Sequence, residues 1–280
     1  MTSEIKHRDF IDQRVNVLGV NVNVISIDQV LCAIFYWCYL RESHYICLCN
    51  VHSVITAQSD TIFSKSINES NIALSDGAPI AWFVKYSSHS AQNRIGGPDL
   101  MWRVFNVLNT SQGIGNCYNA LFMEQNHTPT IFLYGSTAET LSTLADKIHD
   151  TFENVIIAGT YSPPYRDLTE NEENKVIKLI NESGAGIIWV GLGCPKQEKW
   201  MMKNKGRISG VMIGVGAAFD FHAGNIKRAP VIMQKLGFEW LYRLFLEPRR
   251  LWRRYLMTNS SFVYQVFKLL IKKILFIGKK

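Results

Sequence analysis

The chain has 280 residues, 47% of them hydrophobic, which is enough to bury a full core and excludes an intrinsically disordered protein. Its formal net charge is +7, but residues 243–280 hold ten basic residues and one acid, a net charge of +9, and the rest of the chain has a net charge of −2, so we expect an anionic partner at that end only. No apolar stretch is long enough to span a bilayer, no secretory signal opens the chain, and six cysteines without a C-x-x-C pair favour reduced thiols over disulfides or a zinc site.

Apolar runs typical of strands alternate with helical patterns along most of the chain. This alternation predicts an α/β fold with a mainly parallel, Rossmann-like sheet and helices on both faces. In chain order we expect a hairpin over 15–24, a helix over 27–41 capped by Ser26, strands over 45–49 and 71–74, helices over 79–86 and 98–108, a surface insertion over 109–127, a strand over 130–134, a helix over 138–152, a strand over 154–158, a helix over 169–181, a strand over 186–190, a helix over 195–203 and a strand over 211–215.

The most informative segment is W-V-G-L-G-C-P-K-Q-E-K-W at 189–200. An apolar strand leads into a turn containing Gly191 and Gly193, and Pro195 suits the first turn of the helix that follows. The backbone N–H groups of such a turn and the positive helix end favour an anion, so we expect a phosphate-bearing ligand here. The alternative is that the two glycines only turn the chain from strand to helix.

Ligands of parallel α/β sheets bind beyond the carboxyl ends of the strands. Polar residues just after the expected strands should therefore line one crevice. They are Asn50, His52, Asp76 and the segments 135–137, 160–165, 191–197 and 216–220.

Nine short motifs follow one another along the chain. They are S-D-G at 75–77, R-I-G-G-P-D-L at 94–100, Y-G-S at 134–136, G-T-Y-S-P-P at 159–164, V-G-L-G-C-P-K-Q-E-K-W at 190–200, I-G-V-G-A-A-F-D-F-H-A-G at 213–224, R-A-P at 228–230, E-W-L-Y-R at 239–243 and E-P-R-R-L-W-R-R-Y at 247–255. In this order they resemble the WecG/TagA/CpsF glycosyltransferases, glycosyltransferase family 26. The resemblance covers about residues 15–255 and implies inverting transfer of a sugar from a UDP-sugar to a polyprenyl-diphosphate-linked glycan, at the cytoplasmic face of the bacterial inner membrane and without a metal.

The resemblance implies that Asp76 is the catalytic base. Displacement of UDP with inversion needs a base for the proton of the incoming hydroxyl, and a carboxylate at the mouth of the crevice can supply it. From its residues alone, Asp76 could equally be an ordinary turn aspartate or the cap of the next helix.

The chain contains no Asp-x-Asp pair, the motif with which many nucleotide-sugar enzymes hold a divalent ion. We therefore expect no metal and no cofactor, and expect the leaving diphosphate to be stabilised by the N–H groups at 191–194 and by Arg94. The family's matching arginine is tied to substrate. Taken alone, Arg94 could be a solvated loop residue.

Gln197 lies one turn into its helix and could reach a sugar or uracil, as the resemblance implies, or it could be an exposed helix residue. We expect Lys196 and Glu198 to be solvated or paired locally. A lone histidine such as His52 is more often structural, and Asp220 could contact the nucleotide or lie at a packing corner. The expected substrate-binding residues are Asn50, His52, Gly135, Tyr161, Gly191, Gly193 and Asp220 from the core, and Arg243, Arg250 and Arg253 from the C-terminal end.

Arg243, Arg250 and Arg253 are spaced by seven and three. On one helix, or on two broken before Pro248, they share a face, and the resemblance places them in an appendage that could hold the lipid diphosphate. Residues 262–277 have the pattern of an interfacial helix that lies on an anionic membrane, although a partner helix or an oligomer contact would also use its apolar face. We expect a variable segment at 1–14, a catalytic core at 15–228 and a helical appendage at 229–280.

Two other classes of protein remain open. The Gly-x-Gly at 214–216 follows an expected strand like half of a dinucleotide fingerprint, but Phe219 stands where the third glycine of an NAD-dependent oxidoreductase would be. A non-catalytic nucleotide-binding membrane protein would share the crevice and the basic end. Nucleic acid is not an expected partner, because the apolar run at 269–277 favours lipid. Self-association is possible, and no residue chooses among N-acetylmannosamine, its uronic acid and glucuronic acid as donor sugar.

Overall fold

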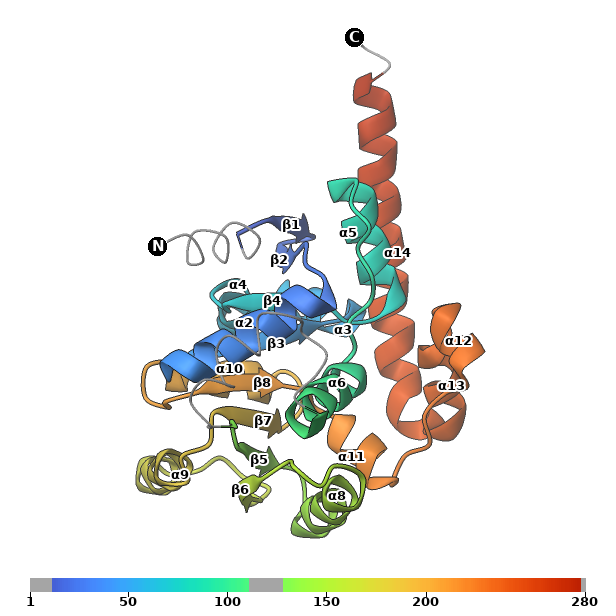
Figure 1. Ribbon diagram of the computed structural model, residues 1–280. Helices are drawn as coiled ribbons and strands as arrows, with labels where there is room; N and C mark the ends of the chain where they lie inside the picture. Colours follow the sequence, from blue (N-terminus) through green and yellow to red (C-terminus); the bar gives the residue numbers. More distant parts are fainter. Residues whose placement is uncertain (1–11, 111–127, 278–280) are drawn as a thin grey trace.

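A computed structural model describes residues 12–110 and 128–277 (Figure 1). Its centre is a six-stranded sheet with the order β4-β3-β8-β7-β5-β6, in which every neighbouring pair is parallel. A separate antiparallel hairpin joins β1 (Arg14–Val17) to β2 (Val20–Asn23). The sheet confirms the predicted α/β fold. Its strands are β3 (His44–Cys49), β4 (Ile72–Ser75), β5 (Ile131–Gly135), β6 (Ile157–Tyr161), β7 (Ile187–Gly191) and β8 (Val211–Gly214).

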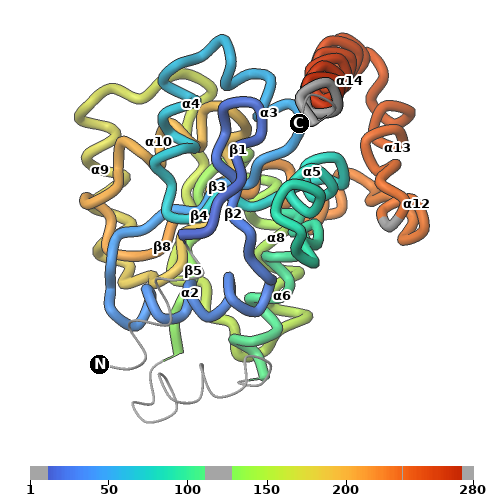
Figure 2. The backbone as a smooth tube through the Cα atoms, turned by 90° about the horizontal axis from the view of Figure 1, so that it is seen from above, coloured from blue at the N-terminus to red at the C-terminus, as the bar shows by residue number. Residues whose placement is uncertain are grey.

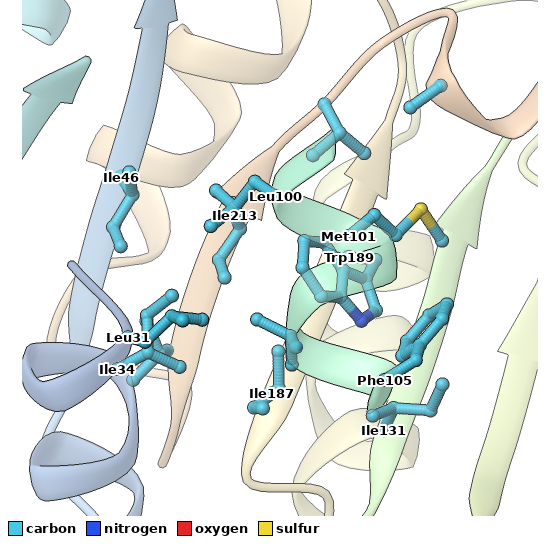
Figure 3. Close-up of a cluster of buried hydrophobic side chains, with 14 of the residues drawn as sticks. Leu31, Ile34, Ile46, Leu100, Met101, Phe105, Ile131, Ile187, Trp189 and Ile213 are labelled. Carbon is cyan, nitrogen blue, oxygen red and sulfur yellow. The ribbon is translucent and has the colours of Figure 1, made fainter. Parts of the chain in front are cut away.

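Helices cover both faces of the sheet, so its strands are apolar on both sides. Trp189 of β7 faces one layer and packs edge-on against Phe105, with ring centroids 5.6 Å apart (Figure 3). Burial of each such large apolar side chain contributes about 1.5–3 kcal/mol. This layer contains α2 (Ile27–Leu40), α6 (Gly97–Thr110), α8 (Ala138–Thr151) and α11 (Ala218–Ala223); the other contains α3 (Val51–Ala57), α4 (Thr61–Asn68), α5 (Ala78–Ser88), α9 (Glu170–Glu182) and α10 (Lys196–Asn204).

Two parts of the predicted element list need correction. Helices α3, α4 and α11 were not expected. The first two begin at a side-chain cap: Asn50 Oδ1 accepts from the Ser53 N–H at 3.1 Å, and Asp60 Oδ1 from the Phe63 N–H at 2.9 Å. Strand β6 begins later than the predicted 154, because Asn154 is held in a turn by two hydrogen bonds to Asn109. Of the expected insertion, residues 111–127 lie outside the described residues.

The C-terminal end forms α12 (Val231–Lys235), α13 (Glu239–Leu246) and α14 (Pro248–Ile277), which stand together beside the sheet (Figure 1). The chain breaks before Pro248, as one of the two expected arrangements required. Residues 262–277 are not a separate helix but the second half of α14, which packs against α3 and is seen nearly end-on in Figure 2. Among the described helices, none combines the length and the apolar character needed to cross a membrane.

Candidate active site

A cavity of about 1300 Å³ lies at the carboxyl ends of the central strands and is bounded on its other side by α13 and α14. It collects residues that follow β3, β4, β7 and β8, so the predicted crevice exists. Ten of the expected site residues line it: Asn50, His52, Asp76, Arg94, Gly191, Gly193, Gln197, Asp220, Arg243 and Arg250.

Asp76 directly follows β4, where its backbone N–H donates to the Cys49 carbonyl at 2.9 Å. The next helix, α5, has Gly77 at its N-cap and no side-chain capping bond, so the helix-cap alternative for Asp76 is wrong. Desolvation by burial raises the pKa of Asp76 to about 6, while Arg94 and a hydrogen bond from the Asn50 side chain act in the opposite direction. The carboxylate is therefore more basic than an ordinary aspartate and is still ionised at neutral pH.

Arg94 is held by carboxylates on two sides. Its guanidinium forms an ion pair with Glu239 of α13 and a second one, at 3.1 Å, with Asp99 of α6. A Cβ on Gly96 would lie 3.4 Å from both Asp76 Oδ1 and Asp99 Oδ2, so these two carboxylates flank the same backbone position. The alternative of a solvated loop arginine is wrong for Arg94.

The glycine turn after β7 is built around Gln197, whose side chain is only 4% exposed. Its Oε1 accepts from the Gly193 N–H at 3.2 Å, so this N–H faces a protein group rather than the cavity. Gly191 packs against Phe219, whose ring a Cβ would approach to 2.7 Å, and Gly193 has a left-handed φ of +79°. The glycines thus meet packing and turn requirements as well as lining the cavity, and the exposed-helix alternative for Gln197 is wrong.

Glu198 is buried at 1% exposure, contrary to the expectation that it is solvated. Its Oε1 accepts from Gln197 Nε2 at 2.9 Å, which confirms the local pairing, and its Oε2 has no partner among the described residues. Burial raises the pKa of Glu198 to about 7. The sequence did contain a signal for the burial of Glu198: it lies three residues before the apolar Met201 and therefore on the same side of α10.

Asn50 and His52 enter the cavity from the start of α3. Asn50 both caps that helix and hydrogen-bonds Asp76. Burial, with a smaller effect of the nearby Arg254, lowers the pKa of His52 to about 4, so its imidazole is neutral at physiological pH. Thr56 Oγ1 lies 3.3 Å from His52 Nδ1.

Gly135 and Tyr161 do not line the cavity. A Cβ on Gly135 would lie 2.5 Å from the Gly191 carbonyl carbon, so the residue is needed for the close approach of two strands. The ring of Tyr161 instead stacks with Tyr134, at a centroid distance of 6.1 Å. The neighbouring Ser136 and Tyr165 line the cavity in their place.

The arginines of the appendage are also rearranged relative to the prediction. Arg253 is exposed and lies over the ring of Trp252 at 5.4 Å, whereas the next residue, Arg254, lines the cavity. The reason is helical spacing, since the cavity follows an i, i+4 row of α14 and residue 253 is outside that row. The row consists of Arg250, Arg254, Thr258, Phe262, Val266 and Leu270.

Three of the cavity arginines have a buried Nε atom without a hydrogen-bond partner among the described residues: Arg228, Arg243 and Arg254. Arg228 is already in ion pairs with Asp99 and Glu239. Arg243 also lies over the ring of Phe221 at 5.2 Å, and Arg250 is paired with Glu247 at 2.7 Å. Arg243 and Arg254, for which no ion pair is found within the described part of the chain, are therefore better placed to bind an anion than Arg228 or Arg250.

Asp220 lies at a packing corner that also forms part of the cavity wall. Phe219 beside it is fully buried, as at a packing corner, while the Asp220 side chain accepts from Asn225 Nδ2 at 3.3 Å and lines the cavity. Within residues 12–110 and 128–277, no three His, Cys, Asp or Glu side chains come together as a metal-ligand group would.

Comparison with known proteins adds the family. A model of the "Glycosyl transferase WecG/TagA/CpsF family" matches residues 15–274. A protein of Bacillus subtilis (strain 168) is 30% identical over 250 residues, covering 86% of this chain and 85% of the relative. One of Staphylococcus aureus (strain NCTC 8325 / PS 47) is 28% identical over 258 residues, covering 91% and 92%. Both are named N-acetylglucosaminyldiphosphoundecaprenol N-acetyl-beta-D-mannosaminyltransferase. The oxidoreductase and non-catalytic alternatives are thereby set aside, and the chain belongs to the WecG/TagA/CpsF family of glycosyltransferases.

Proposed function

We propose that this glycosyltransferase moves N-acetylmannosamine from a UDP-sugar to an N-acetylglucosamine carried on undecaprenyl diphosphate, with inversion and without a metal, in the synthesis of a cell-surface polysaccharide. The names of the relatives support the sugar and the acceptor. The observation that carries the proposal is Asp76, a carboxylate with a pKa of about 6 in a cavity whose other wall supplies arginines.

The proposed reaction is a single displacement at the anomeric carbon. The acceptor hydroxyl oxygen attacks as Asp76 takes its proton, and the bond from the anomeric carbon to the UDP oxygen breaks with its electron pair going to UDP. A base is most effective when its pKa lies near the working pH, which favours Asp76 over an ordinary surface aspartate.

Arg243 and Arg254 are assigned the role of binding the negatively charged diphosphates. Their buried Nε–H groups are unpaired within the described chain, and a guanidinium held in place before the reaction stabilises a developing anion without reorganisation. Arg94 is not assigned to diphosphate binding, because its guanidinium is already paired with the carboxylates of Asp99 and Glu239.

The prenyl chain of the acceptor is assigned to the apolar end of the cavity. There Val263, Val266 and Leu270 of α14 line the same space as Trp82 and Phe83 of α5. Along α14 the residues that line the cavity change from Arg250 and Arg254 to the apolar Phe262, Val266 and Leu270, an order that suits a diphosphate followed by a prenyl chain.

The appendage is proposed to rest on an anionic membrane surface at the cytoplasmic face of the bacterial plasma membrane. Large apolar side chains are exposed on its helices and would enter the interface, while its basic residues meet anionic lipid. Those side chains are Val231, Ile232, Leu236, Phe238, Phe245, Leu246, Trp252, Leu256, Met257, Val263, Tyr264, Phe267, Leu269, Leu270 and Ile271.

The test is a reaction of the purified chain with prenyl-diphosphate-linked N-acetylglucosamine and a panel of UDP-sugars, with and without EDTA. We expect a disaccharide product by mass spectrometry, of inverted anomeric configuration by NMR, from UDP-N-acetylmannosamine and in both conditions. Loss of the product with EDTA would overturn the metal-free mechanism, and transfer from another donor alone would overturn the assigned sugar.

A further inference from the structure

Four charged side chains form a closed cycle at the edge of the cavity. Arg94 pairs with Glu239 and, at 3.1 Å, with Asp99; Asp99 pairs with Arg228 at 2.7 Å, and Arg228 Nε lies 3.9 Å from Glu239 Oε1. Arg94 and Asp99 belong to the core, whereas Glu239 begins α13 of the appendage. The cycle is therefore an electrostatic joint between the two parts.

Glu239 is suited to holding this joint. Its side chain and that of Arg94 are each 20% exposed, so the pair is partly withdrawn from solvent and weakly screened. Each oxygen of Glu239 faces a different arginine, Arg94 and Arg228. A carboxylate in the first turn of α13 is also favoured by the positive end of the helix.

The cycle of charged side chains lies next to Asp76. A Cβ on Gly96 would lie 3.4 Å from Asp76 Oδ1 and 3.8 Å from Arg94 Cζ, so the carboxylate and the guanidinium flank the same glycine. Of the groups acting on Asp76, Arg94, Arg243 and the Asn50 side chain favour the carboxylate, whereas Glu239 opposes it. Cys49 is close enough to Asp76, and His222 close enough to Asp99 and Arg228, for their charges to interact.

We propose that Glu239 is a positioning residue: it fixes the Arg94 guanidinium between core and appendage, and so makes the docked appendage part of the surroundings in which Asp76 acts as base. The inference rests on the proposed function only in naming Asp76 the base. Without the Glu239 charge, Arg94 keeps Asp99 as its paired partner and exerts more positive potential on Asp76, which becomes a weaker base.

The experiment is a direct titration of Asp76 by carboxyl 13C NMR on the full chain, with its signal assigned by its loss in Asp76→Asn. We expect Glu239→Gln to lower the titration midpoint of Asp76 by roughly half to one pH unit. The matched control is Glu247→Gln, which removes a carboxylate from the other end of α13 that is paired with Arg250 and does not line the cavity. The control should leave the midpoint unchanged.

A second arm tests whether Glu239 acts through Arg94. Arg94→Gln should raise the Asp76 midpoint, and adding Glu239→Gln to that variant should shift it by less than Glu239→Gln does alone. Amide hydrogen exchange across α13 follows the docking of the appendage in each variant, and faster exchange in Glu239→Gln would support the joint directly.

An unmoved Asp76 midpoint in Glu239→Gln, or an equal shift in Glu247→Gln, would overturn the inference. The titration needs no turnover. A chain that shifts as expected but transfers no sugar would therefore contradict the proposed function and leave the role of Glu239 standing.

Discussion

Gln197 and Glu198 are consecutive residues that are both buried in the wall of the cavity, and Gln197 Nε2 donates to Glu198 Oε1 at 2.9 Å. The same Gln197 side chain accepts from the Gly193 N–H, so one chain of hydrogen bonds runs from the glycine turn to a buried carboxyl group. The turn at 191–194, which the sequence predicts to bind an anion, is therefore held in shape by Gln197 and Glu198.

Glu198 should make stability depend on pH. Its pKa is raised from the ordinary 4.5 to about 7, so the folded chain holds the proton more tightly than the unfolded chain does. The stabilisation is complete below pH 4.5 and is lost as the pH rises through about 7, with a total of about 3 kcal/mol. Glu198→Gln removes this dependence, so the variant should gain stability relative to the parent between pH 5 and pH 8 in urea unfolding. The exposed Glu182, changed to Gln, is the control, and parallel behaviour of the two variants would contradict the prediction.

Asp76→Asn should reduce kcat by about 10²–10⁴-fold while UDP still binds, because the amide accepts no proton from the acceptor hydroxyl. In the parent enzyme, kcat/KM should fall as the pH drops below about 6, where Asp76 becomes protonated. Steady-state assays and calorimetric titration with UDP measure the two quantities. Near-normal turnover in Asp76→Asn would remove the assigned base.

Adjacent arginines provide a matched pair. Arg254→Ala should lower kcat/KM roughly tenfold to a hundredfold, since it removes a charge-assisted bond to a diphosphate. Arg253→Ala should stay within about twofold, because that side chain is exposed and outside the cavity. Binding of UDP and of the prenyl-diphosphate acceptor, measured separately, shows which diphosphate Arg254 contacts. Equal losses in the two variants would refute the assignment.

The apolar surface of α14 should bind membranes. Phe267 is 60% exposed, and Phe267→Glu places a charge where the ring would enter the interface. Sedimentation with anionic liposomes should decrease for this variant but not for Ile62→Glu, which changes a residue of similar exposure on α4. If Phe267→Glu sediments like the parent, the face has another use, such as self-association, which analytical ultracentrifugation would reveal.

Gly135→Ala should destabilise the fold rather than weaken substrate binding selectively. The residue has a φ of +121°, and a Cβ would lie 2.5 Å from the Gly191 carbonyl carbon. A loss of a few kcal/mol of unfolding free energy is expected from the strain and the clash. An unchanged melting temperature together with a raised KM would restore the binding role first predicted for it.

The sheet and most helices were predictable because their signals are local. Each strand such as 187–191 is a short apolar run, and helices such as α2 carry a cap at a recognisable place, here Ser26 with Gln29. Helices α3, α4 and α11 were missed because they are short. The only signals of α3 and α4 are single capping residues, Asn50 and Asp60, and α11 has no side-chain cap.

The sequence by itself determined the α/β order, the basic C-terminal end and the polar residues after each strand, because the carboxyl ends of parallel strands meet at one edge. Only the tertiary structure decided which of these side chains face the cavity. In the structure Arg254 rather than Arg253 lines the cavity, and Glu198 is buried. Glu239 pairs with Arg94, which is 145 residues away in the chain. The physical reason is that helix phase and docking angle set the direction of a side chain, and both depend on contacts between segments that are distant in the sequence.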